Sequence, residues 1–332
     1  MSRQYHVAIV GATGAVGVEM LDVLERRKFP VSKLTLLASP RSAGRTLKFR
    51  GEDVPVQVLG ADSFAGVEIA LFSAGGGISK EYAPIAVKAG AVVIDNSSAF
   101  RMDDSVPLVV PEINGADVKS HSGIIANPNC TTAITLMGLF PLHKKFRVKR
   151  VFASSYQAVS GAGAQALEEL RAQVSAIEAG AKPEAKVLAH QIAFNVIPQV
   201  DVFLDNGYTK EEMKMQGEGR RIMHLPMFRA SVSCVRVPVY RAHSVAVTAE
   251  FEKPVNVAEA RQAIDAFPGV RVVDVPADKK YPMPLNVAGK DDCEVGRLRL
   301  DCALENGLAF WVCGDQLLKG AALNAVQIAE LV

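Results

Sequence analysis

The chain has 332 residues, enough for two domains with separate cores, and its 49% hydrophobic and 22% charged residues are typical of a globular protein. A net charge of +2 without a basic block or stripe argues against nucleic-acid binding, and no apolar stretch is long enough to cross a membrane. The five cysteines are scattered with no C-x-x-C pair, which argues against a metal site and a disulfide framework. We therefore expect a cytoplasmic protein that holds no metal and binds neither nucleic acid nor membrane.

The first part of the chain alternates short apolar runs with helical patterns. This alternation is typical of β-α-β units, in which parallel strands form one sheet. We therefore predict a Rossmann-like α/β domain. The expected strands are Val7–Val10, Leu34–Leu37, Ile69–Phe72 and Val92–Asp95, and the expected helices are Val18–Arg27 and Lys80–Ala89.

A glycine-rich turn, residues 11–17, joins the first strand to the first helix. Glycines in such a turn let the backbone approach a pyrophosphate, and the helix N-terminus offsets its negative charge. The spacing G-x-x-G-x-x-G is less specific than G-x-G-x-x-G, and a tight turn without a ligand is the alternative. The turn residues that we expect to bind a dinucleotide are Gly11, Thr13, Gly14, Ala15 and Val16.

The segment after the second strand distinguishes between the two nicotinamide dinucleotides. Sites specific for NAD usually place a carboxylate there, which binds the ribose 2′-hydroxyl. Here residues 38–45 read Ala-Ser-Pro-Arg-Ser-Ala-Gly-Arg, with hydroxyls and guanidiniums but no carboxylate. These groups suit a 2′-phosphate, so we predict NADP, bound by Ser39, Arg41 and Ser42. A solvated basic loop is the alternative interpretation of Arg41 and Arg45.

Cys130 lies between an apolar run, Gly123–Ala126, and a helical pattern, Ala133–Phe140. A cysteine at or just before a helix N-terminus is favoured as the thiolate, which is the reactive form. The alternative is a buried, inert cysteine. The position alone does not distinguish between these two interpretations.

From about Val151 the pattern changes. The stretches Ser231–Val239 and Ser244–Phe251 alternate polar and apolar residues as antiparallel strands do. Val151–Tyr156 is a further expected strand, and Gly163–Ile177 and Gln316–Leu331 are expected helices. We predict a second domain of the α+β class.

Arg236 and His243 form the first polar cluster of this second part. Arg236 interrupts the apolar alternation of its strand, and a guanidinium there needs a carboxylate or phosphate to offset its desolvation. His243 follows at an expected turn, where it can reach a cysteine and act as its acid/base. A structural ion pair and a satisfied core histidine are the alternatives.

A second polar cluster lies at the start of an expected helix. Thr209 is an N-cap candidate, and Glu212 completes a capping box. Glu211 and Lys214 are three residues apart and share one face of that helix. The alternative interpretation of this pair is a solvated helix surface.

Taken together, these segments resemble the aspartate-semialdehyde dehydrogenases, which are NADP-dependent enzymes of the aspartate pathway. The resemblance covers essentially the whole chain, and its ordered motifs make a chance match very improbable. The motifs are residues 11–17, Asp95–Arg101, Val110–Asn114, Asn127–Cys130, Tyr156–Gly163, Arg236–Val239 with His243-Ser244, Gly289–Asp292 and Gly314–Ala322.

The resemblance implies roles for the reacting centre. Cys130 is then the nucleophile, His243 the acid/base, and Gln157 orients the substrate. Arg236 binds the α-carboxylate of the substrate, and Glu211 binds its α-ammonium.

The resemblance also implies a phosphate pocket and a nicotinamide side. Arg101, Asn129 and Lys214 are then the phosphate ligands. Family members often carry glycine before the histidine, where this chain has Ala242. The residues implied on the nicotinamide side are Ser160, Gly161 and Gln316.

The implied reaction is the NADPH-dependent reductive dephosphorylation of L-aspartyl 4-phosphate to L-aspartate 4-semialdehyde, through a thioester on Cys130. Another acyl reductase, acting on N-acetylglutamyl phosphate or malonyl-CoA, is the alternative among enzymes. Glu211 argues against both, because neither substrate has a free ammonium beside the carboxylate. A non-catalytic NADP-binding sensor is the alternative from another class, and the presence of Cys130 with Gln157, Arg236 and His243 argues against it.

The resemblance also suggests the domain limits and the assembly. We expect residues 1–128 and 317–332 to form the NADP-binding domain and residues 129–316 the catalytic and dimerisation domain. The segment around Lys182–Glu184 is poor in apolar residues of its own, so we expect a subunit interface in this region. A homodimer is the expected assembly, and a tetramer is the alternative.

Overall fold

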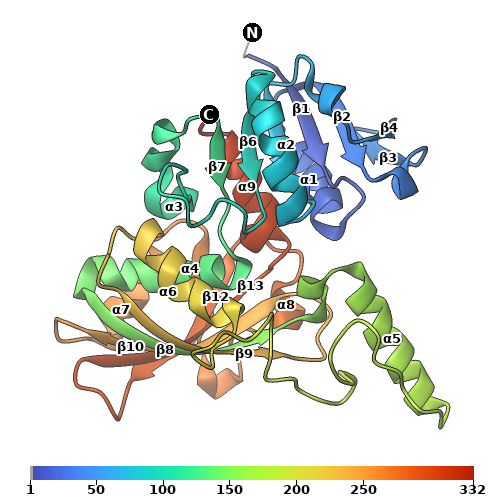
Figure 1. The fold of residues 1–332 in the computed structure, drawn as a ribbon. Coiled ribbons are helices and arrows are strands. Elements are labelled where there is room, and N and C mark those ends of the chain that lie inside the picture. Colours follow the sequence, from blue (N-terminus) through green and yellow to red (C-terminus); the bar gives the residue numbers. More distant parts are fainter. Residues whose placement is uncertain (1–2) are drawn as a thin grey trace. The chain divides into compact units, whose positions relative to one another are not determined.

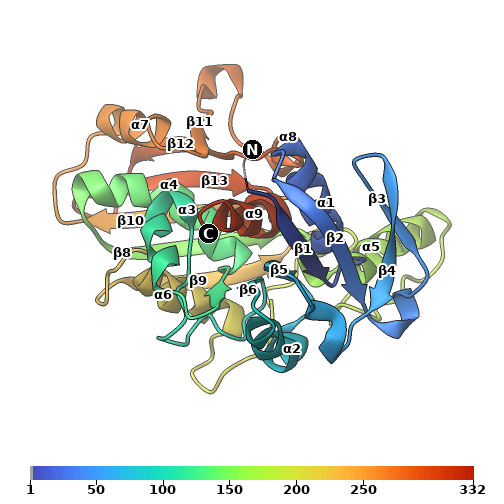
Figure 2. The same cartoon turned by 90° about the horizontal axis from the view of Figure 1, so that it is seen from above.

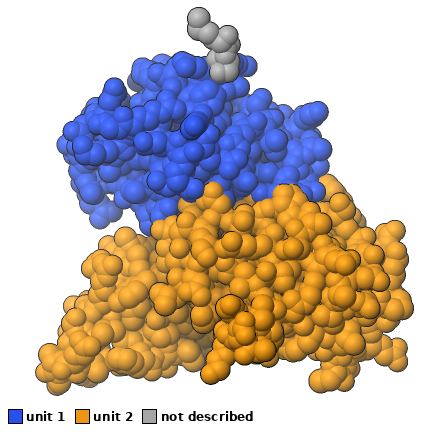
Figure 3. All heavy atoms as spheres, turned by 180° about the vertical axis from the view of Figure 1, so that it is seen from behind, with its two compact units in different colours: residues 1–129, 321–332 blue, residues 130–320 orange. Residues whose placement is uncertain are grey.

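The computed structural model describes residues 3–332, which divide into two compact units (Figure 3). Unit 1 comprises the chain up to Asn129 together with Ala321–Val332, and unit 2 comprises Cys130–Gly320. From the sequence we expect the chain to leave the first domain after residue 128 and to return to it after residue 316. In the structure it enters unit 2 at Cys130 and returns to unit 1 at Ala321.

In its described residues, unit 1 is a seven-stranded sheet with the strand order β3-β4-β2-β1-β5-β6-β7. The neighbours pair in parallel, except in the antiparallel hairpin β3–β4. Helices α1 and α9 lie on one face and α2 on the other (Figure 2), so the predicted α/β class is confirmed. The elements are β1 (Tyr5–Val10), α1 (Ala15–Arg26), β2 (Val31–Ala38), β3 (Thr46–Phe49), β4 (Glu52–Val58), β5 (Ile69–Phe72), α2 (Gly76–Lys88), β6 (Val92–Asp95), α3 (Pro111–Asn114), β7 (Ile124–Ala126) and α9 (Leu323–Ala329).

The central strands of unit 1 are buried on both faces, as their continuous apolar runs indicate. Val10 and Phe72 belong to one core cluster, which helix α2 closes with Ala83 and Ala86. Because α1 begins directly after the glycine turn, its N-terminus lies at the carboxyl edge of β1. Ligands of open α/β sheets bind at this edge.

Unit 2, all of whose residues are described, is a six-stranded mixed sheet with the order β11-β12-β13-β10-β8-β9. Helices α4, α6 and α7 cover one face, and α5 lies beyond the end of the sheet (Figure 1). The predicted α+β class is confirmed. The elements are α4 (Cys130–Phe146), β8 (Val148–Gln157), α5 (Ala164–Glu178), α6 (Lys210–Ile222), β9 (Arg229–Arg236), β10 (His243–Phe251), α7 (Val257–Asp265), β11 (Val270–Val272), α8 (Pro284–Val287), β12 (Cys293–Leu300) and β13 (Gly307–Gly314).

Two expectations from the sequence need correction. Strand β10 is antiparallel to both neighbours, but β9 runs parallel to β8 at the edge of the sheet. The crossover that contains α5 and α6 returns the chain to the starting end of β8, which makes a parallel pair. The helix predicted over Gln316–Leu331 is instead a π-helical turn, Leu318–Ala322, followed by α9, so Gln316 precedes the helical segment.

Candidate active site

The turn between β1 and α1 requires glycine at two positions. A side-chain carbon at Gly11, whose φ is +87°, would lie 2.3 Å from the carbonyl oxygen of Ser73. One at Gly17 would lie 2.3 Å from the carbonyl oxygen of Gly11, so α1 packs directly on the turn. Gly14 is the N-cap of α1 and supplies no capping side chain for the first turn at Ala15–Val16. The start of this helix can therefore hold an anionic group.

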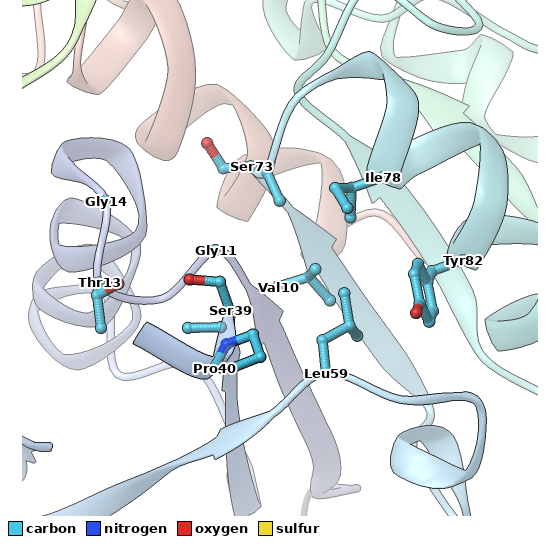
Figure 4. A pocket seen from close by; sticks show the side chains of 12 residues that line it. Val10, Gly11, Thr13, Gly14, Ser39, Pro40, Leu59, Ser73, Ile78 and Tyr82 are labelled. Atoms are coloured by element: carbon cyan, nitrogen blue, oxygen red, sulfur yellow. The ribbon is translucent and has the colours of Figure 1, made fainter. Parts of the chain in front are cut away.

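A cavity of about 340 Å³ opens beside this turn (Figure 4). Thr13 and Ser39 form part of its polar edge, and Leu59, Ile78 and Tyr82 form an apolar wall. A pocket with an apolar wall and a few polar groups suits a nucleoside. The sequence analysis missed the three wall residues, because they lie on other segments and carry no motif. It also missed Ser73, although its place directly after strand β5 marks the carboxyl edge of the sheet.

The loop after β2 lies at the same cavity. Thr13 Oγ1 donates a hydrogen bond of 3.1 Å to Ser42 Oγ, which links the glycine turn to this loop. Arg41 and Arg45 are exposed, and among the described residues no carboxylate lines the cavity. The loop therefore presents hydroxyls and positive charge, as the sequence indicates.

Strand register gathers Gln157, Arg236 and His243 at one end of the sheet in unit 2. Gln157 ends β8 and lies opposite Arg236, which ends β9. His243 begins β10, whose next residue, Ser244, lies opposite Tyr156. Because side chains alternate along a strand, all three point to the helix-covered face, where they are buried.

Cys130 is the first residue of α4 and is partly exposed. A side-chain carbon at Gly320 would lie 2.6 Å from Cβ of Cys130, so the backbone before α9 packs directly on the cysteine. Burial raises the pKa of Cys234 and that of Cys313 to about 12, so these two thiols stay protonated and unreactive. Cys130 differs from these two thiols because it begins helix α4, where the helix dipole favours an anion.

His243 is fully buried, and its pKa falls to about 3, first through burial and then through the charge of Arg236. The backbone N–H of Ala158 donates to Nδ1 over 3.0 Å, so the neutral ring carries its proton on Nε2. Arg236 Nη1 donates to the carbonyl oxygen of Ala158 over 2.7 Å. Burial lowers the pKa of Arg236, while the charges of Glu211 and Cys130 act against this. A guanidinium, an imidazole and a thiol therefore share one site.

Glu211 joins this group from helix α6. Its Oε1 accepts a hydrogen bond of 3.1 Å from Gln157 Nε2, and its Oε2 lies 2.7 Å from Lys214 Nζ. Ser155 Oγ donates to Gln157 Oε1 over 3.1 Å and so fixes the orientation of the amide. The predicted capping box is confirmed, because Thr209 and Glu212 bond each other's backbone N–H groups. Ser155 was missed because nothing in its sequence context marks it.

Gln316 holds the turn that leads into His243. Its Oε1 accepts the N–H of Ala242 over 2.7 Å, and its Nε2 donates to Ser160 Oγ. Ala242 has a φ of +73°, a region that favours glycine, so this bond holds an unfavourable backbone conformation. A side-chain carbon at Gly161 would lie 2.9 Å from Arg236 Nη1 and 3.2 Å from His243 Nε2. Ser160, Gly161 and Gln316 thus meet at His243.

Arg101 and Asn129 belong to unit 1. The guanidinium of Arg101 is buried and donates to the carbonyl oxygens of Asn127 and Asn96, over 2.8 and 2.9 Å. Asn129 is buried and directly precedes Cys130. The segment before the cysteine is therefore fixed by an arginine.

Residues 3–332 contain no group of His, Cys, Asp and Glu side chains arranged to hold a metal ion. None of their helices has both the length and the apolar character needed to cross a membrane.

Family models match both parts of the chain. The semialdehyde dehydrogenase NAD-binding domain matches residues 6–121, and the semialdehyde dehydrogenase dimerisation domain matches residues 139–319.

Full-length relatives agree with these models. The chain is 53% identical to the aspartate-semialdehyde dehydrogenase of Aquifex aeolicus and 50% identical to that of Bacillus subtilis, over 99% of this chain and 98% of each relative. A crystal structure of aspartate semialdehyde dehydrogenase II from Vibrio cholerae, complexed with ASA, superposes with a TM-score of 0.97 at 45% identity, over 99% of this chain and 98% of that one. The chain therefore belongs to the aspartate-semialdehyde dehydrogenase family.

Proposed function

We propose that the protein converts L-aspartyl 4-phosphate to L-aspartate 4-semialdehyde, with NADPH as the reductant and inorganic phosphate as the second product. The observation that carries this proposal is the cluster in unit 2, in which a cysteine at a helix N-terminus shares a site with Arg236, Glu211 and a buried neutral His243. Family membership supports the same activity, and a relative from V. cholerae has been crystallised with ASA.

Cys130 carries the covalent step. Its thiolate attacks the acyl carbon, a C–S bond forms, and the C–O bond to phosphate breaks with release of phosphate. The thioester splits one difficult displacement into two easier steps. NADPH, when bound, supplies the hydride that reduces this thioester.

His243 stabilises the charge that develops in the second step. Its Nε2–H faces the site, so it can donate a hydrogen bond to the oxyanion of the reduced adduct. The C–S bond then breaks, the aldehyde forms and the thiolate of Cys130 is restored, while the proton stays on Nε2. Atoms and charge therefore balance without a further reactant.

The charges of the pocket match those of the substrate. Arg236 presents a planar, two-pronged donor to the α-carboxylate, and Glu211 attracts the α-ammonium. Lys214, Arg101 and Asn129 bind the phosphate, and Gln157 orients the acyl group. The ammonium site argues against N-acetylglutamyl phosphate and malonyl-CoA as substrates.

We assign NADP to the cavity of unit 1. The pyrophosphate lies at the glycine turn of residues 11–16, and the 2′-phosphate is bound by Ser39, Arg41 and Ser42. The absence of a carboxylate among the described lining residues supports NADP over NAD. Ser160, Gly161 and Gln316 serve the nicotinamide side, because they meet at His243.

We further propose a cytoplasmic homodimer that forms through the face of the unit 2 sheet opposite to α4, α6 and α7. Phe152 and Tyr156 are exposed on this face, and the ring of Tyr156 contacts Trp311. Trp311 Nε1 is buried without a hydrogen-bond partner, and a second copy can supply one. The match to a dimerisation domain supports this assembly, and a tetramer built from such dimers is the alternative.

Steady-state assays in the phosphorylating direction test the function. We expect NADP reduction that requires both aspartate semialdehyde and phosphate, with no turnover of N-acetylglutamate semialdehyde. We also expect a preference for NADP over NAD of at least about tenfold, reduced in Arg41→Ala, because a lost charge-assisted hydrogen bond costs about 1.5–3 kcal/mol. NADP binding without turnover would instead indicate a sensor.

A further inference from the structure

Lys214 forms ion pairs with two carboxylates, and the proposed function uses only one of them. Its Nζ lies 2.7 Å from Oε2 of Glu211 and 3.1 Å from Oδ2 of Asp201. Burial lowers the pKa of Lys214, but Glu211 and Asp201 outweigh burial and raise it. The lysine is therefore charged at neutral pH, and Asp201 is an additional negative charge in the substrate pocket.

The chain holds Asp201 in a defined place between two substrate-binding elements. Ile197 exchanges two backbone hydrogen bonds with Arg236, of 2.9 and 2.8 Å. Five residues further on, Val202 accepts the backbone N–H of Lys210 at the start of α6 over 2.9 Å. The segment Ile197–Val202 thus runs from strand β9, which carries Arg236, to helix α6, which carries Lys214.

The backbone of Asp201 supports a specific role for its side chain. Its φ is +70°, in the left-handed region that few residues other than glycine adopt. Its Oδ1 accepts the N–H of Val202 over 2.8 Å, which leaves Oδ2 directed at Lys214. The side chain is about one-third exposed, at 32%, so water screens its charge only in part.

We propose that the negative charge of Asp201 adjusts the affinity of the substrate pocket for two groups of the substrate, its ammonium and its phosphate. Lys214, Glu211 and Asp201 together carry one positive and two negative charges. The surplus negative charge strengthens the attraction for the substrate ammonium and weakens the hold on phosphate, which must leave after each acylation. This role rests on the proposed function and adds a specificity-determining residue to it.

The sign of the effect distinguishes a charge role from a structural one. Removing a negative charge weakens the binding of a cation and strengthens that of an anion. Asp201→Asn keeps the size and the hydrogen-bonding capacity of the side chain but removes its charge. We expect the KM for phosphate to fall and the KM for aspartate semialdehyde to rise, each by about threefold for a partly screened unit charge. If the substitution instead disrupts the structure of the loop, we expect both Michaelis constants to rise.

The experiment compares the wild type with Asp201→Asn and Asp205→Asn in the phosphorylating direction. Asp205 lies in the same loop and is exposed, so its variant controls for the loss of one negative charge at a distance. We expect opposite shifts of the two constants in Asp201→Asn, and values within about twofold of wild type in Asp205→Asn. Shifts of the same sign, unchanged constants, or equal effects of Asp205→Asn would overturn the proposal.

Calorimetric titration with inorganic phosphate, without the other substrates, separates this proposal from the proposed function. If the wild type shows no phosphate-dependent turnover, the proposed function fails, but the titration still measures the charge effect. About threefold tighter phosphate binding by Asp201→Asn than by wild type supports the role of Asp201. Equal or weaker binding, or no phosphate binding by either protein, contradicts it.

Discussion

At the scale of single residues, the site around His243 is defined by close packing and by one buried cation. The ring is fully buried, its Nδ1 accepts the N–H of Ala158, and Gly161 lies against its other edge. Arg236 adds to the effect of burial on the histidine pKa. The histidine is therefore neutral at physiological pH, with its proton on Nε2.

The space beside Gly161 leads to the first prediction. In Gly161→Ala the new methyl group would lie 2.9 Å from Arg236 Nη1, closer than carbon and nitrogen approach in proteins. We expect kcat/KM to fall by at least about tenfold, which corresponds to about 1.4 kcal/mol, because the guanidinium must move. Gly60→Ala is the matched control, since its nearest neighbour is 3.9 Å away. Equal activity of the two variants would show that Gly161 leaves more room than we infer.

The depressed pKa of His243 predicts how stability depends on pH. The unfolded chain takes up this proton near pH 6.5, whereas the folded chain takes it up only near pH 3. The unfolded state therefore binds more protons between these values, and the free energy of unfolding falls as the pH is lowered through this window. We expect urea unfolding of wild type to lose more stability between pH 7 and pH 4 than unfolding of His243→Gln. Parallel losses would contradict the buried neutral state.

At the scale of secondary-structure elements, the position of helix α6 determines where Glu211 and Lys214 lie. The capping box of Thr209 and Glu212 fixes its first turn. Glu212 Oε1 also accepts the backbone N–H of Cys234 over 3.0 Å, which joins helix α6 to strand β9. Glu212 thereby links helix α6, which carries Glu211, to strand β9, which carries Arg236.

The N-cap carries the element-scale prediction. Thr209 is fully buried, and Thr209→Ala removes the oxygen that accepts the N–H of Glu212. We expect a loss of about 1–2 kcal/mol in the free energy of unfolding, as for other N-cap truncations. We also expect a higher KM for aspartate semialdehyde, because Glu211 follows two residues later. Thr209→Ser keeps the oxygen and should restore both quantities, and a failure of this rescue would argue against the cap.

Regular periodicity predicts several elements, although helix α7 and strand β13 were not predicted despite their regular patterns. The strands around Val7–Val10 and Ser244–Phe251 are recognised by continuous apolar or alternating patterns. Strand β12 was missed, because a register shift between Gly296 and Arg299, with Arg297 at a φ of +56°, interrupts its alternation. The direction of β9 was wrong because alternation alone does not show on which side of a strand the chain returns.

The site shows the same division between what sequence can and cannot predict. Cys130, Gln157, Arg236 and His243 are named from local pattern and family resemblance, and the register of β8, β9 and β10 explains why three of them meet. Asp201 carries no motif, and its contact with Lys214 depends on a loop closed by non-local backbone bonds. Such contacts arise only from the folded chain.

At the scale of the whole molecule, the exposed sheet face of unit 2 predicts the assembly. Phe152→Asp places a charge on this face, where Phe152 is 45% exposed in the wild type. We expect a dimer for wild type and a monomer for the variant in sedimentation velocity, because burying an unpaired charge is costly. Val58→Asp, at a similarly exposed position in unit 1, is the control that should stay dimeric. A dimeric Phe152→Asp protein would place the interface elsewhere.

The central claim is that Cys130 forms a thioester with the aspartyl group, and mass spectrometry of the protein and of its peptides tests it most directly. The enzyme is mixed with NADP and aspartate semialdehyde in the absence of phosphate, so that oxidation can proceed but release of the acyl group by phosphate cannot. We predict an aspartyl adduct on the peptide that contains Cys130, which disappears when phosphate is added and does not form in Cys130→Ser. No adduct, an adduct on another residue, or an adduct that persists in Cys130→Ser would contradict the account.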